Sequence, residues 1–319
     1  MSIINKNVLI TGGAGFIGAN FVHKFVDLKY NVNIIEKSGA NLWRINKIKD
    51  KIKIHYVDLK DSRKLELCVA KIKPKIVLHF AAYGVFQRYQ QDINIAIDTN
   101  LRGTINLINA CDKRAIECFI STGTASEYGL KDRPMKEDDL LEPRTFYGVT
   151  KAATSMYCQM VAREFGFPIV IMRPFMAYGY FEEEEKLVPT IIKSCLTNTE
   201  MKLSKPNFVR DFIFIEDLIE AYFLAIKNID IAKGEIFNLG TGKQSNIAEV
   251  VKIVKKITGS KISPKYNQVN PVQHEPQKWV ADNSKAKKIL GWKPKYDLEN
   301  GLAKNIEWFK NNIGLYEKK

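Results

Sequence analysis

Val8-Leu-Ile-Thr-Gly-Gly-Ala-Gly-Phe-Ile-Gly18 decides the fold of this chain, because an apolar run breaks into glycines and then resumes at helical spacing. It predicts a strand, a tight turn and a helix. Gly12 allows the turn, Gly15 leaves room for a pyrophosphate, and Gly18 lets helix and strand pack closely. The helical face continues over the apolar residues Phe16, Ile17, Phe21, Val22 and Phe25. This context predicts a dinucleotide site with the phosphates at the helix N-terminus.

A carboxylate follows at the spacing that such a site requires. Residues 32–36 form the second predicted strand, and Glu36 ends it, 24 positions after Gly12. A carboxylate there accepts hydrogen bonds from the two ribose hydroxyls and repels a 2′-phosphate, so Glu36 favours NAD(H) over NADP(H). Lys37, directly after it, works against this preference, and NADP(H) stays open as the alternative cofactor.

The composition is that of a globular protein with 319 residues, of which 45% are hydrophobic and 26% are charged. No apolar run reaches membrane-spanning length and no signal-peptide segment precedes the first strand, so we expect a cytoplasmic protein that does not bind membranes. The five cysteines lack metal-ligand spacing, and neither a metal site nor a disulfide is expected. The net charge of +14 comes from scattered lysines, not from one basic block, so nucleic acid is not expected as a partner.

Strands and helices alternate through the first half of the chain, with strands predicted over 53–57, 76–80 and 118–121 and helices over 61–71 and 94–113. This alternation predicts an α/β fold with a Rossmann-type, doubly wound parallel sheet. The second half has shorter strands, at 211–215 and 235–239, and a helix over 246–257 that a capping-box pattern begins. We expect a dinucleotide-binding domain over 1–175, to which part of the C-terminal strands returns, and a smaller α/β substrate domain over 176–319.

Ligands of such a sheet bind at the carboxyl ends of its strands. Small side chains there let a ribose lie against the backbone, and an aspartate can accept a hydrogen bond from an adenine amino group. The residues that follow the predicted strands are Asp58-Leu59, Ala81-Ala82-Tyr83-Gly84 and Ser121-Thr-Gly-Thr124.

Tyr147 and Lys151 lie four residues apart in a helix predicted to run to about Phe165. This spacing puts the phenol and the ammonium on one helical face. A nearby cation favours the phenolate, so the pKa of Tyr147 is expected to fall from about 10 toward neutrality, where a phenol can act as a general acid and base. The pair therefore indicates proton transfer next to the dinucleotide.

The chain resembles the extended short-chain dehydrogenases/reductases of the NAD-dependent epimerase/dehydratase family, which act on nucleotide sugars. The resemblance covers nearly the whole chain in the family's order. Its marks are Thr11 to Gly18, Asp58-Leu59, His79 to Ala82, Thr99-Asn100, Ser121 to Gly129, Tyr147 to Lys151, Arg173-Pro174, Arg210-Asp211-Phe212, Asn238-Leu-Gly240 and Leu290-Gly-Trp292.

The resemblance implies a catalytic triad of Thr124, Tyr147 and Lys151, with Thr122 and Ser126 as alternatives for the hydroxyl. Tyr147 would exchange the proton on the sugar oxygen, Thr124 would hold that oxygen, and Lys151 would orient the cofactor and tune the phenol. Arg210 would meet the substrate diphosphate. The implied cofactor residues are Gly12, Gly15, Phe16, Ile17, Glu36, Asp58, Leu59, Ala81, Ala82, Tyr83, Tyr147, Lys151 and Pro174, and the substrate residues are Thr124, Ser126, Met176, Val188, Arg210 and Gln273. Met176 stands where many relatives have Asn, and Gln273-His274 stand where many have Arg-Pro.

The reaction at the sugar stays open between two alternatives. The 4,6-dehydratases carry an Asp-Glu pair after the catalytic threonine, whereas this chain has Ala125 and Ser126, which disfavours dehydration. A reductase of 4-keto-6-deoxysugar nucleotides is favoured, because three stretches look like a branch that finishes CDP- and dTDP-deoxysugars. A 4-epimerase is the alternative, which a retained NAD(H) suits. A non-catalytic dinucleotide-binding regulator is disfavoured by the Tyr and Lys pair. The three stretches are Asn41-Leu-Trp-Arg44, Ala82-Tyr83-Gly84 and Thr122 to Gly129.

The resemblance also implies a homodimer, in which the helix after Asn94 and the helix of Tyr147 pair with their symmetry mates as a four-helix bundle. The apolar side chains expected to supply this contact are Ile95, Ile105 and Ile108 on the first helix and Met156 and Met160 on the second.

Overall fold

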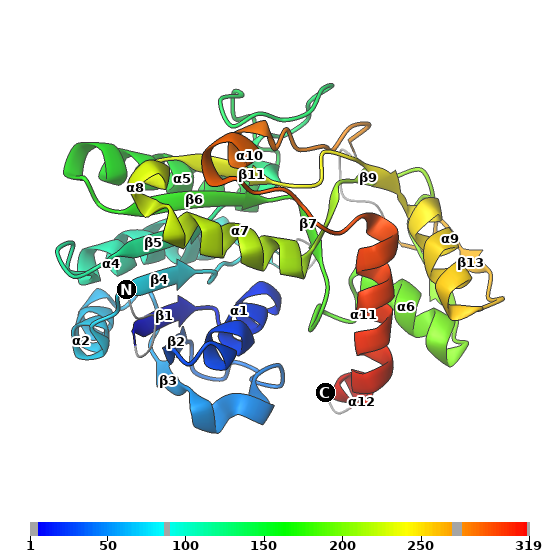
Figure 1. Cartoon of the computed structure of the whole chain (residues 1–319), viewed down its shortest axis with the longest axis horizontal. Coiled ribbons are helices and arrows are strands. Elements are labelled where there is room, and N and C mark those ends of the chain that lie inside the picture. Colours follow the sequence, from blue (N-terminus) through cyan, green and yellow to red (C-terminus); the bar gives the residue numbers. More distant parts are fainter. Residues whose placement is uncertain (1–5, 86–89, 270–275, 318–319) are drawn as a thin grey trace. The chain divides into compact units, whose positions relative to one another are not determined.

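The computed structural model describes residues 6–85, 90–269 and 276–317. It contains a seven-stranded sheet made of β1 (Asn7–Thr11), β2 (Asn31–Glu36), β3 (Lys53–Tyr56), β4 (Ile76–His79), β5 (Cys118–Thr122), β6 (Ile169–Pro174) and β11 (Ile236–Leu239). The strand order is β11-β6-β5-β4-β1-β2-β3 (Figure 1). Every pair from β3 through to β6 is parallel. The predicted doubly wound parallel sheet is confirmed.

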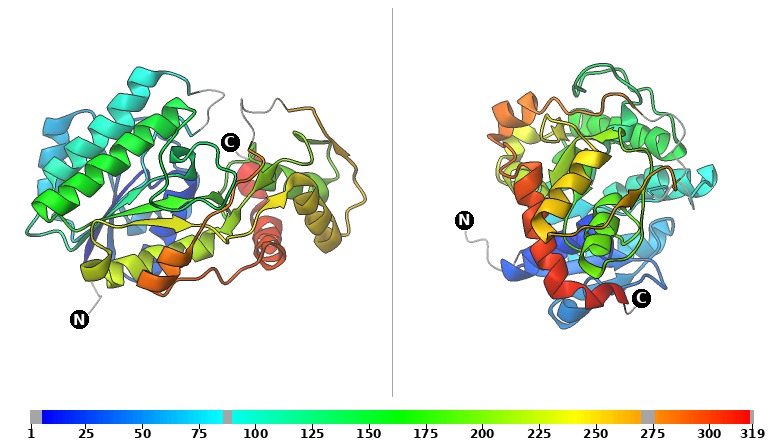
Figure 2. Two further views of the ribbon diagram at one scale, coloured as in Figure 1. Left: turned by 90° about the horizontal axis from the view of Figure 1, so that it is seen from above. Right: turned by 90° about the vertical axis from the view of Figure 1, so that its right-hand side faces the viewer.

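Helices cover both faces of this sheet, as Figures 1 and 2 show. The helical segments are α1 (Phe16–Asp27), η1 (Asn46–Lys51), α2 (Ser62–Ile72), α3 (Ile93–Ala96), η2 (Ile97–Arg102), α4 (Gly103–Ala110), η3 (Ala125–Glu127), α5 (Phe146–Phe165), α7 (Ile215–Lys227) and α8 (Ile229–Ala232). One face is covered by α2, α4 and α5, and the other by α1 and the last turns of α7.

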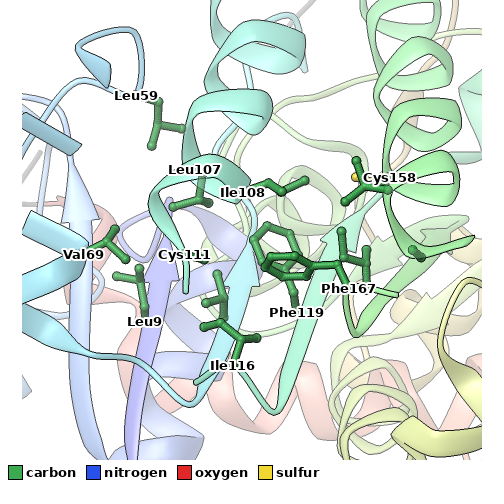
Figure 3. Packing of buried hydrophobic residues seen from close by; sticks show 14 of the residues in the cluster. Leu9, Leu59, Val69, Leu107, Ile108, Cys111, Ile116, Phe119, Cys158 and Phe167 are labelled. Atoms are coloured by element: carbon green, nitrogen blue, oxygen red, sulfur yellow. The ribbon is translucent and has the colours of Figure 1, made fainter. Parts of the chain in front are cut away.

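An apolar core lies between the sheet and α2, α4 and α5 (Figure 3). Leu9 and Phe119 contribute from the strands, and Leu107 and Cys158 contribute from the helices. Ile108 also belongs to this core, where it is 4% exposed. Its expected place on an open dimer face is therefore wrong, because this side of α4 packs on the sheet.

Aromatic rings fill the opposite face of the sheet. The ring of Phe21 lies 4.8 Å from that of Tyr222, and the ring of Phe25 stacks at 4.9 Å on that of Phe223. These rings join α1, which follows the glycine turn, to α7, which lies about 200 residues later in the chain. The helical face predicted from Phe21 and Phe25 is thus a packing face.

The sheet register brings the ends of the central strands level. Thr11 of β1 pairs with His79 of β4, and His79 pairs with Ser121 of β5. Since the strands are parallel, the segments that follow Thr11, His79 and Ser121 leave the sheet at the same edge. That edge carries the glycine turn, the Ala81 to Gly84 segment and the Thr124 loop.

The chain divides into two units that each consist of several segments. The first comprises Met1–Gly129, Leu140–Arg173 and Tyr222–Phe237, and the second comprises Leu130–Asp139, Pro174–Ala221 and Asn238–Lys319. In the second unit, α6 (Leu187–Thr197), α9 (Ile247–Thr258) and α11 (Leu298–Asn312) pack together. The remaining elements there are β7 (Met176–Tyr178), β8 (Met201–Lys202), β9 (Val209–Arg210), β10 (Phe212–Phe214), β12 (Ser245–Asn246), β13 (Pro264–Lys265), α10 (Ser284–Leu290) and α12 (Gly314–Glu317).

Two predicted elements differ from the structure. The helix predicted over 94–113 ends at Ala110, and its middle, η2, is a π-helix. The strand predicted over 211–215 is limited to Phe212–Phe214. Asp211 is buried and binds backbone N–H groups of Thr241 and Ala281, while Ile215 already begins α7, whose acidic first turn favours a helix start.

Candidate active site

The glycine turn is held by close backbone contacts. Gly12 has a φ of +68°, and a Cβ atom there would lie 2.7 Å from the amide nitrogen of Ala81. A Cβ atom on Gly18 would lie 2.1 Å from the carbonyl oxygen of Gly12. Gly15 is exposed and is the N-cap of α1, with no side-chain cap hydrogen bond. The turn therefore offers uncapped N–H groups of the first helical turn, which suit an anion such as a pyrophosphate.

Glu36 lies against this turn. The backbone N–H of Ala14 donates to Glu36 Oε1 at 2.7 Å, and Arg44 Nη1 donates to the Ala14 carbonyl oxygen at 3.2 Å. Burial raises the pKa of the Glu36 carboxyl, and the Ala14 hydrogen bond opposes this. The structure thus brings the predicted ribose acceptor, Glu36, to the predicted phosphate turn, where it contacts Ala14, 22 residues earlier in the chain.

Other predicted cofactor residues lie at the ends of β3 and β4. Asp58 is exposed, and its carboxylate accepts from the Lys60 N–H at 2.9 Å. The side chain of Leu59 is buried in the core beside Gly103, and its carbonyl oxygen accepts from Asn106 Nδ2 at 2.9 Å. Ala81, Ala82 and Tyr83 are half-buried, as are Phe16 and Ile17 in the first turn of α1.

Asn100 connects the segment after β4 to the helix of Tyr147. Its Oδ1 accepts from the Tyr83 N–H at 2.7 Å, and its Nδ2 donates to the Tyr83 carbonyl oxygen at 2.9 Å and to Thr150 Oγ1 at 2.8 Å. Asn100 is 1% exposed and lies in the π-helical η2, which packs beside α5 (Figure 2). The sequence analysis did not predict that Asn100 links these two segments. An asparagine within a predicted helix that has a buried face could have indicated it.

His79 extends the same buried network to the glycine turn. Its Nδ1 is 2.6 Å from Thr11 Oγ1 and its Nε2 is 2.8 Å from Thr104 Oγ1. Burial lowers the pKa of His79 to about 3, and Lys151 adds to this. His79 is therefore neutral over the physiological pH range and acts as a structural bridge.

The structure brings Thr124 and Tyr147 together. Their side chains share a hydrogen bond, whereas Thr122 Oγ1 is buried and lies 2.9 Å from the Tyr222 hydroxyl. The Ser126 N–H donates to Thr124 Oγ1 at 3.2 Å. Among the three candidate hydroxyls, the structure therefore gives Thr124 the contact with the phenol.

Tyr147 and Lys151 lie near the start of α5, which Thr145 caps by accepting from the Gly148 N–H. Lys151 is 3% exposed, and burial lowers its pKa. The expected fall in the pKa of Tyr147 is wrong for the protein without ligands. Burial and the Glu127 charge raise the pKa of Tyr147, and the Thr124 hydrogen bond opposes them only in part.

Gly84 fits against Tyr147. A Cβ atom on Gly84 would lie 3.1 Å from Tyr147 Cβ, and Gly84 has a φ of +97°. Its N–H donates to Gln90 Oε1 at 2.7 Å. The segment after β4 thereby bounds the phenol with backbone, and a side chain at position 84 would push it aside.

The remaining predicted residues lie in the second unit. Pro174 is buried at the end of β6, Met176 is half-buried in β7, and Val188 is 2% exposed in α6. Arg210 is half-buried in β9, with its guanidinium 5.8 Å from the centre of the Trp279 ring. Gln273 and His274 lie outside the described residues.

The described part of the chain also bears on metal binding, membrane crossing and disulfides. No group of three or more His, Cys, Asp or Glu side chains that could hold a metal ion is found there. Within residues 6–85, 90–269 and 276–317, no helix is both long and apolar enough to cross a membrane. All five cysteines are free thiols.

Comparisons with known proteins show which proteins this chain is similar to. Residues 8–240 match the model of the NAD dependent epimerase/dehydratase family. The chain is 28% identical to a UDP-glucose 4-epimerase of Lactobacillus helveticus, over 98% of this chain and 99% of that protein. It is 30% identical to a dTDP-D-glucose 4,6-dehydratase of Bos taurus, over 97% and 90% of the two chains.

A solved structure of a UDP-glucose 4-epimerase with UDP-glucose, from Thermotoga maritima, has a TM-score of 0.86 and 28% identity, and the match covers 96% of this chain and 99% of that one. The fold, the glycine turn and the Tyr and Lys pair thus occur together in a chain that aligns with such enzymes over nearly its full length. The chain belongs to the NAD dependent epimerase/dehydratase family, whose members are enzymes of the extended short-chain dehydrogenase/reductase type.

Proposed function

We propose that this enzyme is an NAD-dependent 4-epimerase of nucleoside-diphosphate sugars. The observation that carries the proposal is the hydrogen bond between Thr124 and Tyr147. Tyr147 lies one helical turn from the buried Lys151, and the loop of Thr124 has no acid at position 125 or 126. Thr124, Tyr147 and Lys151 together can move a proton at one sugar oxygen. Elimination of water would need a further acid and base, and Ala125 and Ser126 do not supply them.

The first unit would hold the dinucleotide. The uncapped start of α1 at Gly15 suits the pyrophosphate, and Glu36 beside Ala14 suits the ribose diol. Bound NAD supplies the acceptor and donor of hydride at C4 of its nicotinamide. Lys151 would hold a ribose hydroxyl, and Asp58 would accept from the adenine amino group.

At the sugar, the phenolate form of Tyr147, which burial disfavours, would take the hydroxyl proton as the carbon is oxidised and would return it when the carbon is reduced. Thr124 would hold the same oxygen by a hydrogen bond. Both steps use one phenol, so the enzyme ends each cycle with its cofactor and its proton restored.

The second unit would bind the nucleotide sugar. Arg210 would pair with the diphosphate, because its planar guanidinium matches phosphate oxygens and its ring contact with Trp279 fixes its direction. Met176 and Val188 would border the sugar, and Gln273 is proposed as a further contact. The UDP-sugar epimerases among the similar proteins support this substrate class.

A 4-keto-6-deoxysugar reductase is the second candidate, favoured by the stretches Asn41 to Arg44, Ala82 to Gly84 and Thr122 to Gly129. The two activities differ in their use of cofactor. We expect the purified enzyme to interconvert a UDP-hexose and its C4 epimer, followed by NMR, with no net change in nicotinamide absorbance. Loss of reduced nicotinamide in step with a 4-keto-6-deoxysugar nucleotide, with no interconversion of hexoses, would establish the reductase instead.

We further propose a homodimer formed through α5 and the helical run from α3 to α4. Ile95, Met156 and Met160 are exposed by 41%, 64% and 41%, so α3 and α5 both carry apolar side chains that a second copy could cover. Ile105 is half-buried and would border the contact. Light scattering at micromolar concentration should give twice the chain mass, and Met156→Glu should shift it toward the monomer. A monomeric unaltered enzyme would disprove the assembly.

A further inference from the structure

Glu127 is a fully buried acid next to the proposed catalytic hydroxyl. It is 0% exposed and ends the short helix η3. Glu127 Oε1 accepts from the Thr124 N–H at 2.8 Å, and the Thr124 side chain in turn caps the same turn. This reciprocal capping box fixes the backbone of the residue that touches Tyr147.

The second carboxylate oxygen is bound by a buried guanidinium. Arg173 is 1% exposed, and its Nε and Nη2 both lie 2.8 Å from Glu127 Oε2. Arg173 Nη1 donates to the Tyr128 hydroxyl at 2.8 Å. A fork of two N–H groups on one oxygen holds the carboxylate in one orientation.

Gly123 leaves space for this carboxylate. A Cβ atom on Gly123 would lie 2.5 Å from Glu127 Oε1 and 2.9 Å from Arg173 Cγ. Glycine at position 123 therefore makes room for the buried ion pair, whose desolvation cost is offset only by close pairing and further hydrogen bonds.

The groups that face Glu127 come from two elements. Arg173 faces it from β6, and Tyr147, Lys151, Ser155 and Cys158 face it from α5. Burial raises the pKa of Glu127, and the Arg173 charge and the Ser155 hydrogen bond lower it. Burial also raises the pKa of the Cys158 thiol to about 11, so that thiol is neutral. Glu127 is thus the negative charge that acts on both members of the Tyr and Lys pair.

We infer that Glu127 is a positioning residue for the reaction: its carboxylate orients Thr124 toward Tyr147 and supplies the negative charge that balances the buried Lys151. The inference rests on the proposed roles of Thr124, Tyr147 and Lys151. The Glu127 charge disfavours the phenolate of Tyr147 and favours the ammonium of Lys151, so its removal should lower the pKa of both groups.

The test compares Glu127→Gln with the unaltered enzyme. The amide keeps an acceptor for the Thr124 N–H and removes the charge. We expect the Tyr147 phenol to titrate at a pH lower by about one unit, followed by NMR of Cζ-labelled tyrosine with Tyr147→Phe to assign the signal. The pH dependence of kcat should move in the same direction.

Two further variants separate this role from a merely structural one. Tyr128→Phe removes a neighbouring hydrogen bond of Arg173 and should lower Tm without moving the Tyr147 titration. Glu127→Gln with Arg173→Gln removes both charges, avoids an unpaired buried guanidinium, and should still lower the titration pH. An unchanged Tyr147 titration in both Glu127 variants would overturn the inference. Failure of the unaltered enzyme to turn over any nucleotide sugar would refute the proposed function, and the NMR comparison would still decide the role of Glu127.

Discussion

Replacement of Asn100 by Ala should weaken the fold and the proposed site together. Asn100 makes three hydrogen bonds with its side chain, two to the backbone of Tyr83 and one to Thr150. A buried hydrogen bond contributes about 1 kcal/mol net, and each group left without a partner costs about 1–3 kcal/mol. Because water would reach some of these groups, we expect the free energy of unfolding to fall by about 3–5 kcal/mol.

The activity should fall as well, because Asn100 ties the segment that bounds the phenol to the helix that carries it. Thr150 lies directly before Lys151, and Gly84, directly after Tyr83, packs on Tyr147. A small displacement of such groups lowers kcat/KM by about 10- to 100-fold. Asn100→Asp keeps an acceptor for the Tyr83 N–H but turns a buried carboxylate oxygen toward the Tyr83 carbonyl oxygen and Thr150 Oγ1, so it should be no more stable than Asn100→Ala.

Urea unfolding and steady-state kinetics measure both effects. The matched control is Asn109→Ala, which removes an exposed asparagine from α4, in the same helical run. The control should change the free energy of unfolding by no more than about 0.5 kcal/mol. If Asn100→Ala matched the control in both stability and kcat/KM, the buried network would not be what connects the Tyr83 segment to α5.

Three further predictions concern the proposed site. Tyr147→Phe should keep the fold, seen as an unchanged circular dichroism spectrum, and lower kcat by roughly 10² to 10⁴, the range for loss of one general acid and base; near-normal turnover would refute the assignment. NAD(H) should bind tighter than NADP(H) by about tenfold or more, and Glu36→Ala should narrow the gap in calorimetry, since it removes the acceptor near Ala14; equal affinities in the unaltered enzyme would contradict this. Gly18→Ala should cost about 1–3 kcal/mol in urea unfolding and weaken NAD binding, because its Cβ would lie 2.1 Å from the Gly12 oxygen; a variant of unaltered stability would show that the turn yields easily.

The amino-acid sequence by itself determined the fold class and the glycine turn between β1 and α1. Periodicity is local information, and the alternation of strands and helices is therefore visible without coordinates. The need for glycine at position 18 is local as well, because its Cβ atom would meet the carbonyl oxygen of Gly12, only six residues earlier in the chain. The four-residue spacing of Tyr147 and Lys151 likewise follows from helix geometry alone.

Tertiary structure decided which groups meet and how they are charged. Burial in a packed site raised the pKa of Tyr147, although a lysine four residues away suggested a fall. Which of the two threonine hydroxyls meets the Tyr147 phenol depended on where Tyr147 and Tyr222 lie, 23 residues after Thr124 and 100 residues after Thr122. Desolvation and contacts between distant segments set these properties, and neither is encoded in local spacing.

The same reason explains the buried groups that prediction did not identify. The capping box of Thr124 and Glu127 was not predicted, and only the fold supplied Arg173, 46 residues later, as the partner of the Glu127 carboxylate. Ile108 satisfied the pattern for an open helix face, and the sheet beneath α4 buried it. A residue's type and spacing indicate what it can do, and the packing of the whole chain determines whether water, an ion pair or the core surrounds it.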